Sequence, residues 1–161
     1  MSRVFWTGLA IGGAVLVETA LGYLVAAPGR YLDPFLLVAV YCALASGETQ
    51  GMLAGSAAGW VQDTLFGGRV LGLSAFAKLV VGFAVGLAAG RFLLTSAAAR
   101  ALVVLLATLA DAALVQWLAS VFAVETSGLS ALGLASRATL NALAGGLLFT
   151  LVERRRQGSG L

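Results

Sequence analysis

Residues 51–73, GMLAGSAAGWVQDTLFGGRVLGL, decide how this chain is expected to fold. The stretch begins with three glycines spaced four residues apart, at Gly51, Gly55 and Gly59. On a helix this spacing forms one stripe of small residues, against which a neighbouring helix can approach to backbone contact. A glycine-rich turn follows, where positive φ lets the chain reverse. The same spacing then recurs in the next apolar run, at Gly82, Gly86 and Gly90. We therefore expect two closely packed helices at the centre of a helical bundle.

The composition places this bundle in a membrane. Of the 161 residues, 60% are hydrophobic and 11% are charged, and the mean hydropathy is +0.99. Soluble domains contain about 25% charged residues, so a soluble fold is excluded. A membrane span needs about 20 apolar residues, which leaves room for five or six spans and for no soluble enzyme domain. The lone cysteine, Cys42, lies in an apolar run and gives no information about redox compartment.

The predicted fold is all-α, a single transmembrane domain over residues 1–152 with a short basic tail at 153–161. We expect six spans, at residues 4–27, 34–46, 49–66, 71–94, 101–123 and 132–152. The first run is too long for a signal peptide and contains Glu18, so it is interpreted as an uncleaved helix. Pro34 suits the first turn of the second helix, because the N–H that proline lacks would be unpaired there. This second helix is short, and without it the chain would have five spans.

The arginines favour six spans with both termini in the cytoplasm of a bacterial cell. In that topology the cytoplasmic segments hold Arg3, Arg91, Arg100, Arg154, Arg155 and Arg156. The outer loops hold Arg30, Arg69 and Arg137. Cytoplasmic loops carry the excess of arginine and lysine in membrane proteins, and the split of six to three agrees with this rule.

Several polar side chains fall inside the predicted spans, and each needs a partner, a wet cavity or a function. Apart from Asp63, this intramembrane polar set consists of Glu18, Lys78, Asp111, Gln116 and Asn141. Measured along the helices, the set falls in the outer half of the bundle or near its middle, which suggests a polar pocket or contact surface that opens outward. Lys78 is expected to pair with Glu18, or failing that with Asp63. The alternative is purely structural, with these groups bonding one helix to another.

The turn between the two glycine-bearing helices is the predicted partner-binding surface. It offers a carboxylate, exposed backbone and a guanidinium at the outer membrane edge, through Gln62, Asp63, Gly67, Arg69 and Gly72. In the alternative interpretation, Asp63 only caps the bundle by accepting hydrogen bonds from amides of the turn.

The sequence contains no pattern typical of catalysis or of cofactor or metal binding. It has no histidine and therefore no histidine–glutamate metal spacing, and it has no nucleophile elbow and no phosphate loop. The sequence also offers no basic surface with aromatic residues of the kind that nucleic-acid binding needs. We therefore expect no catalytic, cofactor-binding or metal-binding residues.

Residues 32–91 resemble the rod shape-determining protein MreD family. The shared features are Pro34-Phe-Leu-Leu at a helix start, Tyr41-Cys-Ala-Leu before a polar turn, the first glycine helix, Gln62-Asp63, and a glycine-rich turn into Leu71-Gly-Leu-Ser-Ala. The family commonly has an acidic or amide residue after the proline. Here Phe35 stands there and Asp33 precedes the proline, so the resemblance assigns no role to a carboxylate at this turn.

The resemblance implies a non-catalytic scaffold of the cell-elongation (rod) complex in the bacterial inner membrane. The implied direct partner is the bitopic protein MreC, with links to MreB filaments, to wall-synthesis proteins and to membrane lipid. The resemblance also implies a fold similar to substrate-binding subunits of energy-coupling-factor transporters, so the alternative function is a solute-binding subunit. The short outer loops favour the scaffold. A membrane enzyme could use only Asp63, Glu18 and Asp111, none of which has a partner base or metal ligand.

Overall fold

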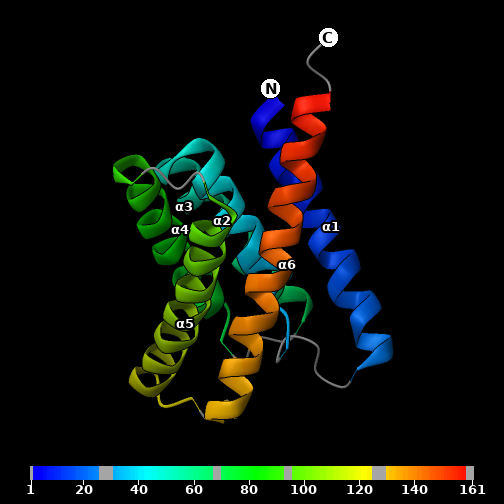
Figure 1. The fold of residues 1–161 in the computed structure, drawn as a ribbon. Coiled ribbons are helices and arrows are strands. Elements are labelled where there is room, and N and C mark those ends of the chain that lie inside the picture. The colour runs from blue at the N-terminus through cyan, green and yellow to red at the C-terminus, as the bar shows by residue number, and fades with distance from the viewer. Residues whose placement is uncertain (1, 26–30, 67–69, 93–95, 125–129, 159–161) are drawn as a thin grey trace.

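The computed structural model describes residues 2–25, 31–66, 70–92, 96–124 and 130–158. These residues form six helices and, within the described ranges, no strand. The helices are α1 (Ser2–Leu24), α2 (Pro34–Ser46), α3 (Glu48–Leu65), α4 (Leu73–Arg91), α5 (Ala97–Val121) and α6 (Ala131–Gly158). They alternate in direction, so that α1 begins and α6 ends at the same end of the bundle (Figure 1).

Four of the six helices in the described residues are long and apolar enough to cross a membrane. They are α1, α4, α5 and α6, which have 23, 19, 25 and 28 residues. Helix α2 is apolar but has only 13 residues. Helix α3 has 18 residues, but polar residues lie near both of its ends, and it is not among the four. The structure is that of an all-helical multi-pass membrane protein, in which α2 and α3 pack against these four helices.

Helices α3 and α4 form the most extensive contact in the bundle. The glycine stripes lie at this contact: a Cβ atom added at Gly55 would collide with the backbone of Lys78, and one added at Gly82 would collide with the backbone of Gly51. Gly51, Gly59 and Gly86 are equally close to neighbouring backbone. Gly90 differs from the prediction, because a Cβ atom there would meet nothing within 4 Å. It lies in the last turn of α4, beyond the start of α3.

Local signals explain where the helices begin. The Asp33 side chain accepts a hydrogen bond from Leu36 N at 2.9 Å and caps α2, with Pro34 in the first turn as predicted. Helix α4 begins at Leu73 rather than Leu71, because Gly72 has the left-handed φ of +96°. Helix α5 begins four residues earlier than expected, because Ser96 Oγ accepts a hydrogen bond from Ala99 N and caps it.

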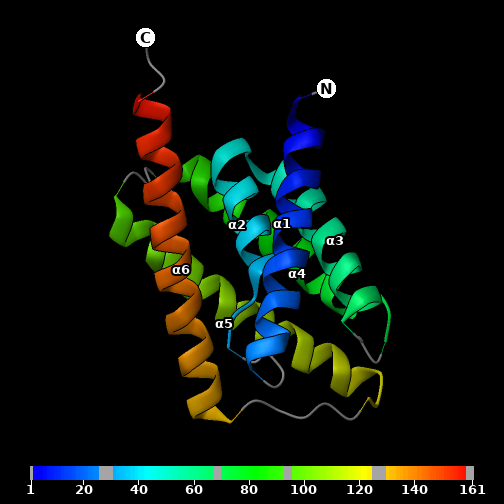
Figure 2. The same cartoon turned by 90° about the vertical axis from the view of Figure 1, so that its right-hand side faces the viewer.

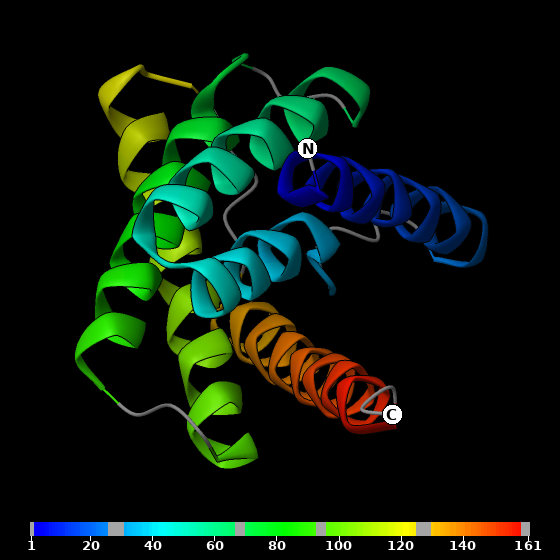
Figure 3. The same cartoon turned by 90° about the horizontal axis from the view of Figure 1, so that it is seen from above.

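Helix α2 lies in the middle of the bundle. Viewed along the bundle, α3 and α4 lie on one side of it, while α1 and α6 extend away on the other (Figure 3). Figure 2 shows α1 and α6 on that second side, with α2 between them. Helix α1 packs on α2, touches α3 slightly, and makes no contact with α6 in the described part of the chain. Buried side chains of α2, α4 and α5, with Phe149 of α6, form the main apolar core.

Candidate functional site

Four buried charges meet where α2 begins and where α4, α5 and α6 pass one another. Asp33 Oδ2 lies 2.9 Å from Lys78 Nζ and 2.6 Å from Arg137 Nη2. Asp111 accepts from the same two cations, at 3.4 Å from Lys78 Nζ and 3.5 Å from Arg137 Nη2. The side chains of Asp33, Lys78 and Asp111 are at most 2% exposed, and that of Arg137 is 12% exposed. We call these four residues the charge cluster.

Two neutral side chains complete the hydrogen bonding around the charge cluster. Asp33 N donates to Asn141 Oδ1 at 2.9 Å, and Asn141 Nδ2 donates to Thr108 Oγ1 at 3.1 Å. Thr108 Oγ1 in turn donates to the backbone oxygen of Val104 on its own helix. Asn141 and Thr108 are fully buried. The start of α2 is therefore bonded to α5 and α6 through groups that have no access to solvent.

The charge cluster has two positive and two negative members, so it is neutral as a unit. A buried ion pair must offset the cost of removing its charges from water, which requires short contacts and satisfied hydrogen bonds. Asp33 meets this requirement with two cations and a backbone N–H. The arrangement holds four helices in register.

The predicted pairing of Lys78 with Glu18 or Asp63 is wrong. Lys78 pairs with Asp33 and Asp111, whereas Glu18 is buried on α1 with Oε2 lacking a hydrogen-bond partner among the described residues. Residue rise along a helix gives depth in the membrane, but the direction in which a side chain points depends on helix packing. Lys78 faces the start of α2 and the middle of α5, where it contacts Asp33 and Asp111.

Sequence reasoning misses two members of the charge cluster. It places Asp33 in a loop and Arg137 among the outer-loop cations, but Arg137 lies inside α6 and is largely buried. The signals are present: Asp33 directly precedes a helix-starting proline, and Arg137 is five residues into a predicted span. Of the predicted polar set, Lys78 and Asp111 contact each other, and Asn141 is bonded to Asp33 beside them. Gln116 lies apart, because it is exposed on α5.

In the predicted partner-binding turn, the carboxylate points into the protein instead of lying at its surface. The carboxylate of Asp63 is buried, and its Oδ2 accepts hydrogen bonds from Gly72 N at 2.9 Å and Ser74 N at 3.1 Å. Asp63 therefore caps the start of α4, as in the structural alternative. Gln62 Oε1 is buried without a hydrogen-bond partner in the described part of the chain. Gly67 and Arg69 lie outside the described residues.

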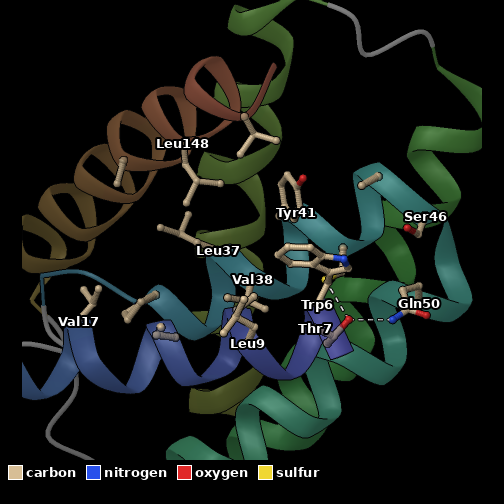
Figure 4. A pocket seen from close by; sticks show the side chains of 18 of the residues that line it. Trp6, Thr7, Leu9, Val17, Leu37, Val38, Tyr41, Ser46, Gln50 and Leu148 are labelled. Atoms are coloured by element: carbon tan, nitrogen blue, oxygen red, sulfur yellow. Dashed lines mark hydrogen bonds between the residues drawn. The ribbon is translucent and has the colours of Figure 1, made fainter. Parts of the chain in front are cut away.

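A cleft of about 880 Å³ lies between α1 and α6, with α2 as its floor. Figure 4 shows apolar side chains such as Leu37, Val38 and Leu148 facing into it. At one end Gln50 Nε2 donates to Thr7 Oγ1 at 3.1 Å. We call this cleft the α1–α6 groove. Among the described residues, no group of three or more histidine, cysteine or acidic side chains is placed to hold a metal ion.

A family model described as rod shape-determining protein MreD matches residues 15–154, which is most of the chain. Neither a curated protein nor a solved structure matches significantly. The matched range begins within α1 and includes all four members of the charge cluster.

Proposed function

The chain belongs to the rod shape-determining protein MreD family, and from this membership we propose that it is a non-catalytic scaffold of the cell-elongation complex. In this role it binds the bitopic partner MreC directly in the inner membrane. MreB filaments and wall-synthesis proteins are its further partners in the same complex. Bacterial cell shape and lateral peptidoglycan synthesis then depend on this chain because it binds a partner helix within the membrane.

The charge cluster favours a scaffold over a solute-binding subunit. A solute site needs polar groups that converge on an open cavity. Here Lys78, Asp33 and Asp111 instead satisfy one another, and all three are buried. The predicted similarity in fold to substrate-binding subunits of energy-coupling-factor transporters stays a prediction. The cluster supports a rigid body that presents its outer faces to other proteins.

The outer face of α1 is the observation that carries the proposal. Gly8 and Gly12 are spaced as on the glycine stripes of α3 and α4, yet a Cβ atom added at either would meet nothing within 4 Å. Large exposed apolar side chains flank them on the same face: Phe5, Leu16 and Tyr23. Small residues in membrane helices mark places where another helix approaches closely. We assign this face to the single transmembrane helix of MreC.

Replacing Gly12 with leucine is expected to lower the recovery of MreC on co-purification at least fivefold. Leucine at a close helix contact overpacks it, at a typical cost of about 1–3 kcal/mol. The matched control is Gly13→Leu, because Gly13 is also open but faces the α1–α6 groove. Both variants are compared at equal amounts of inserted chain. If Gly12→Leu and the parent recovered equal amounts of MreC, the outer face of α1 would not be the MreC-binding surface.

The α3–α4 turn is proposed as a second contact, at the membrane edge. It comprises Gln62, Asp63, Gly67, Arg69 and Gly72. Because the Asp63 carboxylate is buried against Gly72 N and Ser74 N, we propose that it shapes the turn for the partner rather than touching it.

Asp63→Asn is expected to retain most partner binding, whereas Asp63→Ala is expected to lose it several-fold. Asparagine keeps a carbonyl oxygen that can accept from both amides, while alanine removes the cap and costs about 1 kcal/mol of stability. Co-purification of MreC and thermal unfolding in detergent measure the two effects. Asp63→Asn could instead lower the recovery of MreC as far as Asp63→Ala does while unfolding at the same temperature as the parent. That result would show that the partner recognises the negative charge of Asp63 directly.

We propose that all six helices cross the membrane and that both termini are cytoplasmic. The common end shared by the start of α1 and the end of α6 supports an even number of crossings (Figure 1). The burial of Arg137 strengthens the arginine argument, because it leaves only Arg30 and Arg69 in the predicted outer loops.

A further inference from the structure

The α1–α6 groove is apolar over most of its length and lies among the membrane helices. Its walls are Leu9, Gly13 and Val17 of α1 on one side and Leu148 and Val152 of α6 on the other. Its floor is the face of α2 that carries Leu37, Val38 and Tyr41. Since the described residues of α1 and α6 do not contact each other, the groove separates them along the bundle. A membrane-facing cleft of this kind suits a flexible apolar chain.

The two ends of the groove differ in polarity. Thr7, Ser46 and Gln50 line the end where α1 begins, and Trp6 stands beside them with an exposed ring (Figure 4). The opposite end is lined by Leu32 and Pro34. Tryptophan is enriched at the membrane–water interface, so the polar end is the one nearest the headgroups. The groove therefore has the polarity of an amphiphile with its head at the start of α1.

Positive charge gathers in the sequence directly beyond this polar end. Arg3 precedes Trp6 by three residues on α1, and Arg154, Arg155 and Arg156 follow Val152 on α6. Both helices have these residues at the same end of the bundle (Figure 2). Glu153 directly precedes the three arginines of α6, and Glu48 begins α3 two residues before Gln50, so four arginines stand against two acids and leave a net positive charge. Clusters of basic residues at a membrane surface attract anionic lipid.

We propose that the α1–α6 groove is a binding site for an anionic phospholipid. An acyl chain lies along α2 between α1 and α6, and the phosphate sits at the end marked by Trp6 and Gln50. This inference does not depend on the proposed function. Gly8 and Gly12 do not line the groove, and at about 100° per residue they lie roughly 100–180° around α1 from Gly13 and Val17.

The test is retention of lipid by the purified full chain, measured by native mass spectrometry. The chain is delipidated in detergent and titrated with phosphatidylglycerol or with phosphatidylcholine of the same acyl chains. We expect one tightly held phosphatidylglycerol and at least tenfold weaker binding of phosphatidylcholine. Gly13→Phe fills the groove from a position with open space and should abolish the tight site. Gly12→Phe, at the neighbouring open position that does not line the groove, should leave the site intact.

A second comparison tests the charge. Replacing Arg154, Arg155 and Arg156 together with glutamine should reduce the preference for phosphatidylglycerol at least tenfold, because each arginine near anionic lipid contributes about a fivefold gain. Arg91→Gln on α4 is the control, because Arg91 lies on a helix that does not line the groove. Equal binding of the two lipids by the parent would overturn the proposal. So would a tight site that survives Gly13→Phe.

Discussion

Lys78→Met is expected to destabilise the protein by about 3–5 kcal/mol, the cost of leaving a buried charge without its partner. The substitution keeps the length of the side chain and removes the cation that touches Asp33 and Asp111. Both carboxylates are at most 1% exposed, so water cannot take the place of the ammonium group. The remaining charge cluster would hold two anions and a single cation, Arg137.

The double variant Lys78→Met/Asp111→Asn should recover much of this loss, because it leaves the neutral pair Asp33–Arg137 at 2.6 Å. The matched comparison is Lys78→Met/Glu18→Gln, which removes an acid that does not contact Lys78. Thermal unfolding in detergent, followed as the fraction of chain that remains monodisperse, ranks the four proteins. If Glu18→Gln rescued Lys78→Met as well as Asp111→Asn does, the pairing seen in the charge cluster would not be the one that matters for stability.

Gly55→Leu is expected to cost about 3 kcal/mol, the upper part of the usual range for overpacking. A Cβ atom at Gly55 would collide with the carbonyl group of Lys78, which is helix backbone and cannot rotate away as a side chain could. Helices α3 and α4 would have to separate, and Lys78 would move with α4 away from Asp33. The loss should therefore appear both in stability and in the integrity of the charge cluster.

Gly90→Leu is the control for this prediction, since Gly90 lies on α4 with open space around it. Leucine favours helix over glycine by up to about 1 kcal/mol, so Gly90→Leu should be neutral or slightly stabilising. Unfolding of both variants in the same detergent makes the comparison. If Gly55→Leu unfolded at the same temperature as the parent, α3 and α4 would be able to separate without loss of stability.

The helices can be predicted closely where the sequence carries a local stop or start signal. The predicted helix at residues 34–46 forms α2 within the same bounds, because Pro34 begins the helix and Gly47, at φ +89°, ends it. The end of α6 cannot be predicted in this way. The charged residues after Val152 suggest a flexible tail, but glutamate, arginine and glutamine are good helix formers, and α6 continues to Gly158.

The charge cluster can be predicted only in part, because it depends on long-range packing. The sequence indicates that Lys78, Asp111 and Asn141 are costly inside a membrane and need partners. It does not indicate that the loop residue Asp33 folds inward to meet them, since that follows from the position of α2 in the middle of the bundle. The contact between Asp33 and Arg137 joins residues 104 positions apart, and no local pattern encodes it.

That separation has a consequence for how the protein is made. At synthesis rates of roughly 5–20 residues per second, Arg137 leaves the ribosome about 5–20 s after Asp33. By the end of this interval Asp33, Lys78 and Asp111 have all been synthesised, so within the charge cluster two carboxylates face one ammonium group until Arg137 arrives. The last helix therefore delivers the counter-charge as well as apolar surface. A chain that ends before α6 leaves one carboxylate of the charge cluster without a counter-charge inside the membrane, so the unfinished bundle carries the cost of a buried, unpaired charge that the finished bundle avoids.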